Sequence, residues 1–137
     1  MDPTTKSTRH VLVVDDDRTM RVLLSAFLRA GGHDTEVASG GEEALALLAA
    51  GPPDLVLLDY MMSGMSGLEA LRRMRAEPRM DDVPILMLTG MDLDARVEEA
   101  LLAGADGYVR KPVDRRSLLA RVDAALQGRA GPGSSAA

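Results

Sequence analysis

The sequence contains no cysteine, and this absence removes several kinds of chemistry at once. Disulfide bonds, thiolate metal sites and cysteine nucleophiles are all excluded. The chain also lacks an uninterrupted apolar run long enough to cross a membrane. Of its 137 residues, 46% are hydrophobic and 27% are charged, so we expect one soluble globular domain with a core of its own.

Two further absences concern location and partners. Residues 1–10 are polar and lack the apolar stretch of a secretory signal, so we expect a cytoplasmic protein with no membrane partner. The formal net charge is −5, and an acidic chain lacks the general basic surface that binds nucleic acids. We therefore expect no nucleic-acid binding by this chain alone.

The spacing of apolar residues alternates between two patterns along the chain. Unbroken apolar runs favour strands that are covered on both faces. They lie at residues 11–14, 55–58, 83–88 and 108–109, with a weaker run at 35–38. Helical spacing predicts helices at 20–28, 41–50, 67–77, 93–101 and 118–126. Five β-α repeats predict an α/β fold, a parallel sheet with helices on both faces, because parallel strands need right-handed crossovers.

We expect the folded domain to cover residues 9–127. Residues 1–8 are interpreted as an N-terminal tail. Residues 128–137 contain glycine, serine, alanine and proline without periodicity, and this composition predicts a flexible tail or the stub of a linker.

Polar side chains follow the predicted strands at positions where a surface loop would not need them. They are Asp15 and Asp16 after the first strand, Asp59 after the third, Thr89 after the fourth and Lys111 after the fifth. In a doubly wound sheet these positions meet at one edge. Clustered carboxylates repel one another unless a cation joins them. Oxygen ligands without histidine or thiolate favour Mg²⁺.

Lys111 is informative because the chain otherwise prefers arginine. Fourteen of the sixteen basic residues are arginine, and Lys6 is the only other lysine. A compact ammonium group suits a point contact to one carboxylate or phosphoryl oxygen. A carboxylate can attack phosphorus to give an aspartyl phosphate, while a metal and a lysine neutralise charge on the transferred group. These residues together predict phosphoryl transfer to an aspartate.

The chain resembles the receiver domain of two-component response regulators over roughly residues 8–127. The resemblance depends on an ordered set of short motifs. They are Val-Val-Asp15-Asp16, Leu-Leu-Asp59, Met62-x-x-x-x-Gly67, Leu-Thr89-Gly90, Gly104-Ala105-Asp106-Gly107-Tyr108 and Lys111-Pro112. The resemblance implies a three-layer, doubly wound, flavodoxin-like fold, in which a five-stranded parallel sheet has the strand order 2-1-3-4-5 and is accompanied by five helices.

The same resemblance implies a metal site and a phosphoacceptor. Asp59 would be the phosphoacceptor. Mg²⁺, for which Mn²⁺ can substitute, would be bound by Asp15, Asp16, Asp59 and the backbone carbonyl of Met61.

Other matching residues would bind the phosphoryl group or report its presence. Thr89 and Tyr108 would form a switch pair, in which the hydroxyl moves toward the phosphoryl group and the ring follows inward. Lys111 would contact a phosphoryl oxygen, and Gly90 would leave room for the phosphodonor. Pro112 and Gly67 would be structural, and the Lys111-Pro112 bond is often cis in this family.

The resemblance also implies partners. The phosphoryl group would come from a histidine kinase or a histidine phosphotransfer protein, and the chain would be no enzyme beyond self-phosphorylation from a phosphodonor and autodephosphorylation. A downstream protein would be controlled by the face that contains residues 93–101, 108–109 and 118–126. We expect a monomer or a phosphorylation-dependent dimer that acts as a stand-alone receiver or phosphorelay intermediate. The alternative is the N-terminal receiver fragment of a larger regulator with an output domain.

The sequence departs from the family pattern at one position near the predicted site. Ser63 follows Met62, where the family usually has proline. Because proline stiffens the backbone, we expect a more mobile loop after Asp59. The departure concerns the geometry of this loop and not the chemistry.

Two other functions stay open on the sequence alone. Asp15, Asp17 and Thr19 match the nucleophile motif of phosphatases that resemble the haloacid dehalogenase superfamily, with Asp15 as the nucleophile. That family needs a further acidic pair at a strand end, and it leaves Asp59 without a role. A pseudo-receiver without phosphorylation is the second alternative, although every expected reactive residue is present. Asp17 alone is interpreted as a helix N-cap.

Overall fold

The computed structural model describes residues 8–90 and 94–128. Within these ranges one parallel sheet contains five strands, β2 (His10–Val14), β3 (Asp34–Ala38), β4 (Leu55–Asp59), β5 (Ile85–Thr89) and β6 (Gly107–Arg110). Their order across the sheet is β3-β2-β4-β5-β6, and every neighbouring pair is parallel. Counted along the chain this order is 2-1-3-4-5, so the predicted topology is confirmed.

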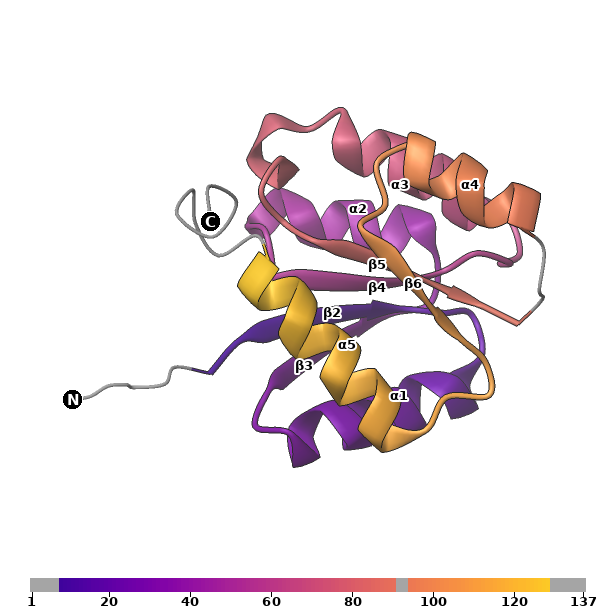
Figure 1. Ribbon diagram of the computed structural model, residues 1–137. Coiled ribbons are helices and arrows are strands. Elements are labelled where there is room, and N and C mark those ends of the chain that lie inside the picture. Colours follow the sequence, from indigo (N-terminus) through magenta and orange to yellow (C-terminus); the bar gives the residue numbers. More distant parts are fainter. Residues whose placement is uncertain (1–7, 91–93, 129–137) are drawn as a thin grey trace.

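Helices connect the strands and cover both faces of the sheet. In the described ranges they are α1 (Arg18–Ala30), α2 (Gly41–Ala50), α3 (Gly67–Arg75), α4 (Asp94–Leu102) and α5 (Arg115–Gly128), with a short 3-10 turn η1 (Pro78–Met80). Helices α2, α3 and α4 lie on one face, and α1 and α5 lie on the other (Figure 1). No helix in the described part of the chain is both long and apolar enough to span a bilayer.

The observed boundaries differ from the predicted ones in a few places. Strand β5 begins at Ile85, two residues after the start of its apolar run, because Pro84 has no N–H to donate to the sheet. The Pro84 carbonyl still accepts a hydrogen bond from the Val56 N–H at 3.0 Å. Leu93, which was predicted to begin a helix, lies outside the described residues, as do most of the two predicted tails (1–7 and 129–137).

Two apolar layers enclose the sheet, one on each face. Successive side chains of a strand point to opposite faces. In β2, Leu12 and Val14 therefore pack in a cluster with residues of α2 and α3, whereas Val11 and Val13 pack with residues of α1 and α5. Strand β4 is buried along its whole length. This double burial explains why the strands have continuous apolar runs instead of alternation.

The strand order places two acidic residues side by side. Strands β2 and β4 are neighbours, and Val14 is aligned with Leu58 in their register. The next residues, Asp15 and Asp59, therefore lie together at the carboxyl edge of the sheet. This edge is also where the chain changes direction across the sheet, which is the usual place of a binding site in such folds.

Arg75, at the end of α3, joins several segments near the opposite edge of the sheet. Its guanidinium group donates to the carbonyls of Gly104 (2.9 Å) and Met80 (2.6 Å) and to the carboxylate of Asp106 (2.8 Å). The same Asp106 oxygen accepts the N–H of Ile85 at 2.8 Å. The Arg75 side chain is only 14% exposed. This contact fixes the starts of β5 and β6 relative to α3, although no residue pattern predicted it.

Gly67 begins α3 directly against the end of β4, where a side chain would collide with backbone. An added Cβ would overlap the Asp59 carbonyl oxygen and lie 2.8 Å from the Tyr60 Cα. We expect Gly67→Ala to lower the free energy of unfolding by about 2–3 kcal/mol, since both contacts are rigid backbone. Urea denaturation measures this loss. The control is Gly128→Ala, where an added Cβ meets no described atom within 4 Å; equal stability of the two variants would contradict this packing.

Candidate functional site

Two buried carboxylates and one partly buried lysine, from three strand ends, form the centre of the site. Lys111 Nζ lies 3.2 Å from Asp15 Oδ2 and 3.2 Å from Asp59 Oδ1. Asp15 is 0% exposed and Asp59 is 4% exposed. The backbone N–H of Lys111 donates to the Thr89 carbonyl at 2.7 Å, which fixes the backbone of the lysine beside β5. The ammonium group offsets part of the cost of burying two carboxylates.

Asp15 is held by both its backbone and its side chain. Its N–H donates to the Ala38 carbonyl at 3.1 Å, and its Oδ1 accepts the Asp17 N–H at 2.9 Å. The Arg21 guanidinium donates to the Asp15 carbonyl oxygen at 2.8 Å. Asp17 caps α1 by accepting the Thr19 N–H at 3.0 Å, so its predicted role as an N-cap is confirmed.

Asp16 differs from Asp15 in being exposed. Its Oδ2 accepts the backbone N–H of Ser63 at 2.8 Å. Proline at position 63 would have no N–H to donate, so the departure from the family pattern supplies this hydrogen bond. The expected mobility of the loop stays a prediction, but the loop has a defined contact with the site.

The three carboxylates can each give one oxygen to a single cation. These oxygens, from Asp15, Asp16 and Asp59, all lie within 4.8 Å of one another. A set of hard oxygen donors fits Mg²⁺, and also Mn²⁺, better than it fits a softer ion. The side chain of Met61 is largely exposed, and ligation by its carbonyl oxygen stays a prediction.

The protonation states of the site follow from burial and charge. Burial raises the pKa of Asp59 to about 6, and the charge of Asp15 adds to the rise. Lys111 and the backbone N–H of Met61 act against it by favouring the carboxylate. Burial opposes the charged form of Lys111, but the charges of Asp59 and Asp15 outweigh it and raise the lysine pKa. At neutral pH Lys111 is therefore protonated and Asp59 is mostly ionised.

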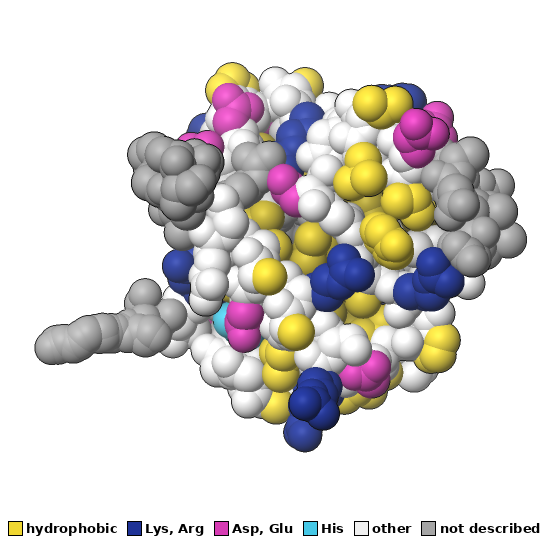
Figure 2. All heavy atoms as spheres, viewed as in Figure 1, with side chains coloured by type: hydrophobic (Ala, Val, Ile, Leu, Met, Phe, Trp, Pro, Cys, Tyr) yellow, Lys and Arg dark blue, Asp and Glu magenta, His cyan; other side chains and the backbone are white. Residues whose placement is uncertain are grey.

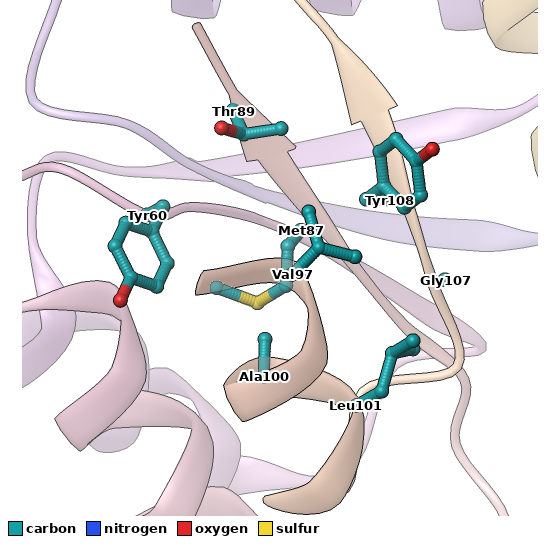
Figure 3. A pocket seen from close by; sticks show the side chains of 8 residues that line it. All are labelled: Tyr60, Met87, Thr89, Val97, Ala100, Leu101, Gly107 and Tyr108. Atoms are coloured by element: carbon teal, nitrogen blue, oxygen red, sulfur yellow. The ribbon is translucent and has the colours of Figure 1, made fainter. Parts of the chain in front are cut away.

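Thr89 and Tyr108 line one apolar pocket between β5, β6 and α4 (Figure 3). The other residues of its lining are Tyr60, Met87, Val97, Ala100, Leu101 and Gly107. The Tyr108 ring is half-buried, and the guanidinium carbon of Arg121 lies 5.3 Å from its centroid, within the range of a cation–π contact. Both members of the predicted switch pair thus border the same apolar space.

Gly90 and Pro112 lie beside Lys111. Among the described residues, an added Cβ at Gly90 would meet the Lys111 side chain alone, at 3.9 Å or more. The Lys111-Pro112 peptide bond is cis, as the resemblance implied.

Apolar side chains gather on the surface where α4 and β6 lie (Figure 2). Leu101, which lines the pocket with Tyr108, is 46% exposed. Leu102 is 84% exposed and borders a surface hollow with Arg72 of α3. Apolar side chains that gather in a contiguous surface patch often mark a contact site. The face that was predicted to control a partner is therefore partly apolar.

Two residues near the site were not expected from the sequence. Arg21 supports the Asp15 carbonyl, and Tyr60 lines the pocket while its hydroxyl donates to Glu99 at 3.4 Å. The only signal for either residue is its place in the chain, five residues after Asp16 and one after Asp59. Neither spacing by itself indicates a contact.

The phosphatase alternative loses support in this structure. Asp15 is buried, and both of its carboxylate oxygens already accept hydrogen bonds. Asp17 is used as an N-cap. The later acidic residues are also engaged elsewhere, since Asp114 accepts the Ser117 N–H at 2.8 Å and Asp123 lies 3.1 Å from His33.

Comparisons with known proteins agree on one family. A family model described as the response regulator receiver domain matches residues 11–123. The phosphate regulon transcriptional regulatory protein PhoB of Pseudomonas aeruginosa is 38% identical over 127 residues, which are 93% of this chain and 55% of that protein. Response regulator MprA of Mycolicibacterium vanbaalenii is 45% identical over 117 residues, which are 85% of this chain and 50% of that protein. The chain thus spans about half the length of the curated relatives it matches.

Solved structures give the same result. Chemotaxis protein CheY4 of Vibrio cholerae superposes with a TM-score of 0.84 at 31% identity, covering 87% of this chain and 99% of that chain. The receiver domain of Francisella response regulator 1452 has a TM-score of 0.80 at 30% identity, covering 88% of this chain and 98% of that chain.

The raised pKa of Asp59 predicts a pH-dependent gain in stability when its charge is removed. Between pH 4 and about 6 the folded state binds more protons than the unfolded state, so the stability from this group falls as the pH rises through that window. Without divalent cations, we expect Asp59→Asn to raise the free energy of unfolding at pH 7.5 by on the order of 1 kcal/mol.

Urea denaturation at several pH values measures this effect. The gain should shrink toward pH 4, where Asp59 is protonated in the folded protein. Asp34→Asn, at an exposed position of the edge strand β3, is the control and should show no such trend. A variant Asp59→Asn that is no more stable than the wild type at pH 7.5 would refute the assigned cause.

Proposed function

The chain belongs to the response regulator receiver domain family, and from this membership we propose that Asp59 accepts a phosphoryl group in a Mg²⁺-dependent reaction. The observation that carries the proposal is the contact of Lys111 with both Asp15 and Asp59 at the carboxyl edge of the sheet. Asp16 stands beside them as the third oxygen donor.

Asp59 is a better nucleophile candidate than its neighbours. The family motif Leu-Leu-Asp59 supports Asp59 as the phosphoacceptor, and Asp59 is slightly more exposed than Asp15, at 4% against 0%. Asp16 is held by the Ser63 N–H. Asp59 is ionised at neutral pH, so its attack needs no general base. The absence of a side chain at Gly90, which lies beside Lys111, supports the approach of a donor there.

The reaction is a transfer between two nucleophiles. An oxygen of Asp59 forms a bond to phosphorus while the bond between phosphorus and the donor's imidazole nitrogen breaks, and that nitrogen leaves with the electron pair. Asp15, Asp16, Asp59 and the Met61 carbonyl would hold Mg²⁺, which neutralises charge on the phosphoryl oxygens when it is bound. Lys111 exchanges part of its contact with the carboxylates for a phosphoryl oxygen. Hydrolysis of the aspartyl phosphate returns the starting state.

The donor in this proposal is a histidine kinase or a histidine phosphotransfer protein. The chain itself catalyses only its own phosphorylation and dephosphorylation. PhoB is named a transcriptional regulatory protein, and MtrA of Mycolicibacterium smegmatis, 43% identical over 119 residues, is named a DNA-binding response regulator. For this chain we propose a cytoplasmic receiver over residues 9–127, acting alone, in a phosphorelay or as part of a larger regulator.

The output of the proposed switch is the face formed by α4, β6 and α5. Movement of the Thr89 hydroxyl toward the phosphoryl group leaves space at one side of the pocket, and the Tyr108 ring then moves inward. Leu101 on α4 lines this pocket and is 46% exposed. The surface around Leu101 would change with the switch, which supports control of a downstream protein or a phosphorylation-dependent dimer.

Identification of the phosphorylated residue tests the proposal. We expect acetyl phosphate with Mg²⁺ to add one phosphoryl group to the wild-type chain, and reduction with borohydride followed by peptide mass spectrometry to place it on Asp59. Asp59→Asn should show no label, and EDTA should suppress the reaction, because charge on the transferred group is then not neutralised.

Asp17→Asn is the matched control, since asparagine also caps a helix and the side chain takes no part in the proposed transfer. It should be labelled like the wild type. A label on Asp15 would favour the phosphatase alternative. No label on the wild type, together with no binding of beryllofluoride, would favour the pseudo-receiver.

A further inference from the structure

The loop after Asp59 contacts the cation site through one backbone hydrogen bond. The Ser63 N–H donates to Asp16 Oδ2 at 2.8 Å, across 47 residues of sequence. Asp16 is the exposed member of the three carboxylates, whereas Asp15 and Asp59 are buried. The hydrogen bond therefore reaches the carboxylate that the core does not hold in place.

The buried carboxylates have other supports. Asp15 accepts hydrogen bonds from Asp17 and Lys111, and Asp59 accepts them from Lys111 and Met61. An exposed aspartate without such contacts samples several rotamers, and ordering it when a ligand binds costs free energy. For Asp16, the Ser63 N–H supplies the ordering before the ligand arrives.

We propose that the Ser63 backbone N–H is a positioning group for Mg²⁺, which holds the Asp16 carboxylate by Oδ2 and leaves its Oδ1 available to the cation. This inference depends on the proposed binding of Mg²⁺ by Asp15, Asp16 and Asp59. A hydrogen bond from an N–H to an ionised carboxylate is stronger than one between neutral groups, so a single contact is sufficient to order the side chain.

The donor is the backbone, so the role of residue 63 depends on its having an N–H and not on its side chain. Any residue except proline supplies this hydrogen. The Ser63 side chain is itself exposed. Whether position 63 is proline thus decides whether Asp16 is ordered in advance, and with it the affinity for Mg²⁺.

Titration calorimetry of the unphosphorylated full chain with MgCl₂ tests the inference. We expect Ser63→Ala, which keeps the N–H, to bind Mg²⁺ within about twofold of the wild type. Ser63→Pro should bind about tenfold more weakly, the loss expected for one hydrogen bond to a charged group. A variant with an ester in place of the amide between residues 62 and 63 removes the hydrogen without adding a ring, and should weaken binding in the same direction.

A second readout does not involve the metal. In the metal-free protein, hydrogen exchange at the Ser63 amide should be slowed, and Asp16→Ala should accelerate it, because the acceptor is lost. The ester variant gives the decisive binding result if Ser63→Pro does not fold.

Two results would overturn the inference and are distinguishable from failure of the proposed function. If the wild type binds Mg²⁺ but the ester variant and Ser63→Pro bind as tightly as Ser63→Ala, or more tightly, the Ser63 N–H has no positioning role. If the wild type binds no Mg²⁺ at all, the proposed metal site fails and the inference fails with it.

Discussion

Two buried carboxylates share one ammonium group in this molecule, and the rest of the site depends on that contact. Asp15 and Asp59 lie side by side because Val14 and Leu58 are aligned in the sheet. Lys111 lies 3.2 Å from each of them. A single positive charge cannot satisfy two buried negative charges fully. Burial, and after it the repulsion from Asp15, therefore keeps the pKa of Asp59 raised. A bound cation would neutralise the negative charge that Lys111 leaves uncompensated.

The fold explains how residues so far apart in the sequence reach one point. Each comes from the carboxyl end of a parallel strand, and the order β3-β2-β4-β5-β6 brings these ends together at one edge. The same edge holds Thr89, which lines the apolar pocket with Tyr108. Strands β5 and β6 thus connect the edge that contains Asp59 to the surface formed by α4, β6 and α5. We propose that this connection transmits phosphorylation to a partner.

Much of this arrangement could be predicted from residue patterns. Continuous apolar runs such as 11–14 and 55–58 predicted buried parallel strands, and the polar residues after them predicted the edge where Asp15, Asp59 and Lys111 meet. Contacts made by backbone groups or long side chains could not be predicted, because they depend on the path of loops. The Ser63 N–H to Asp16 and the Arg75 contacts at the far edge are examples. The sequence indicated a difference at Ser63 but not the hydrogen bond that it allows.

An NMR titration of the Asp59 carboxyl carbon tests the central claim most directly. The pH is changed in the absence of divalent cations. The account predicts that Asp59 in the wild type titrates near pH 6. It also predicts that Lys111→Met raises this pKa further, because the charge that favours the carboxylate is removed. An Asp59 that titrates near its ordinary value of about 3.9, or a pKa that falls in Lys111→Met, would contradict the claim that burial and the charge of Asp15, opposed by Lys111, set the protonation of the site.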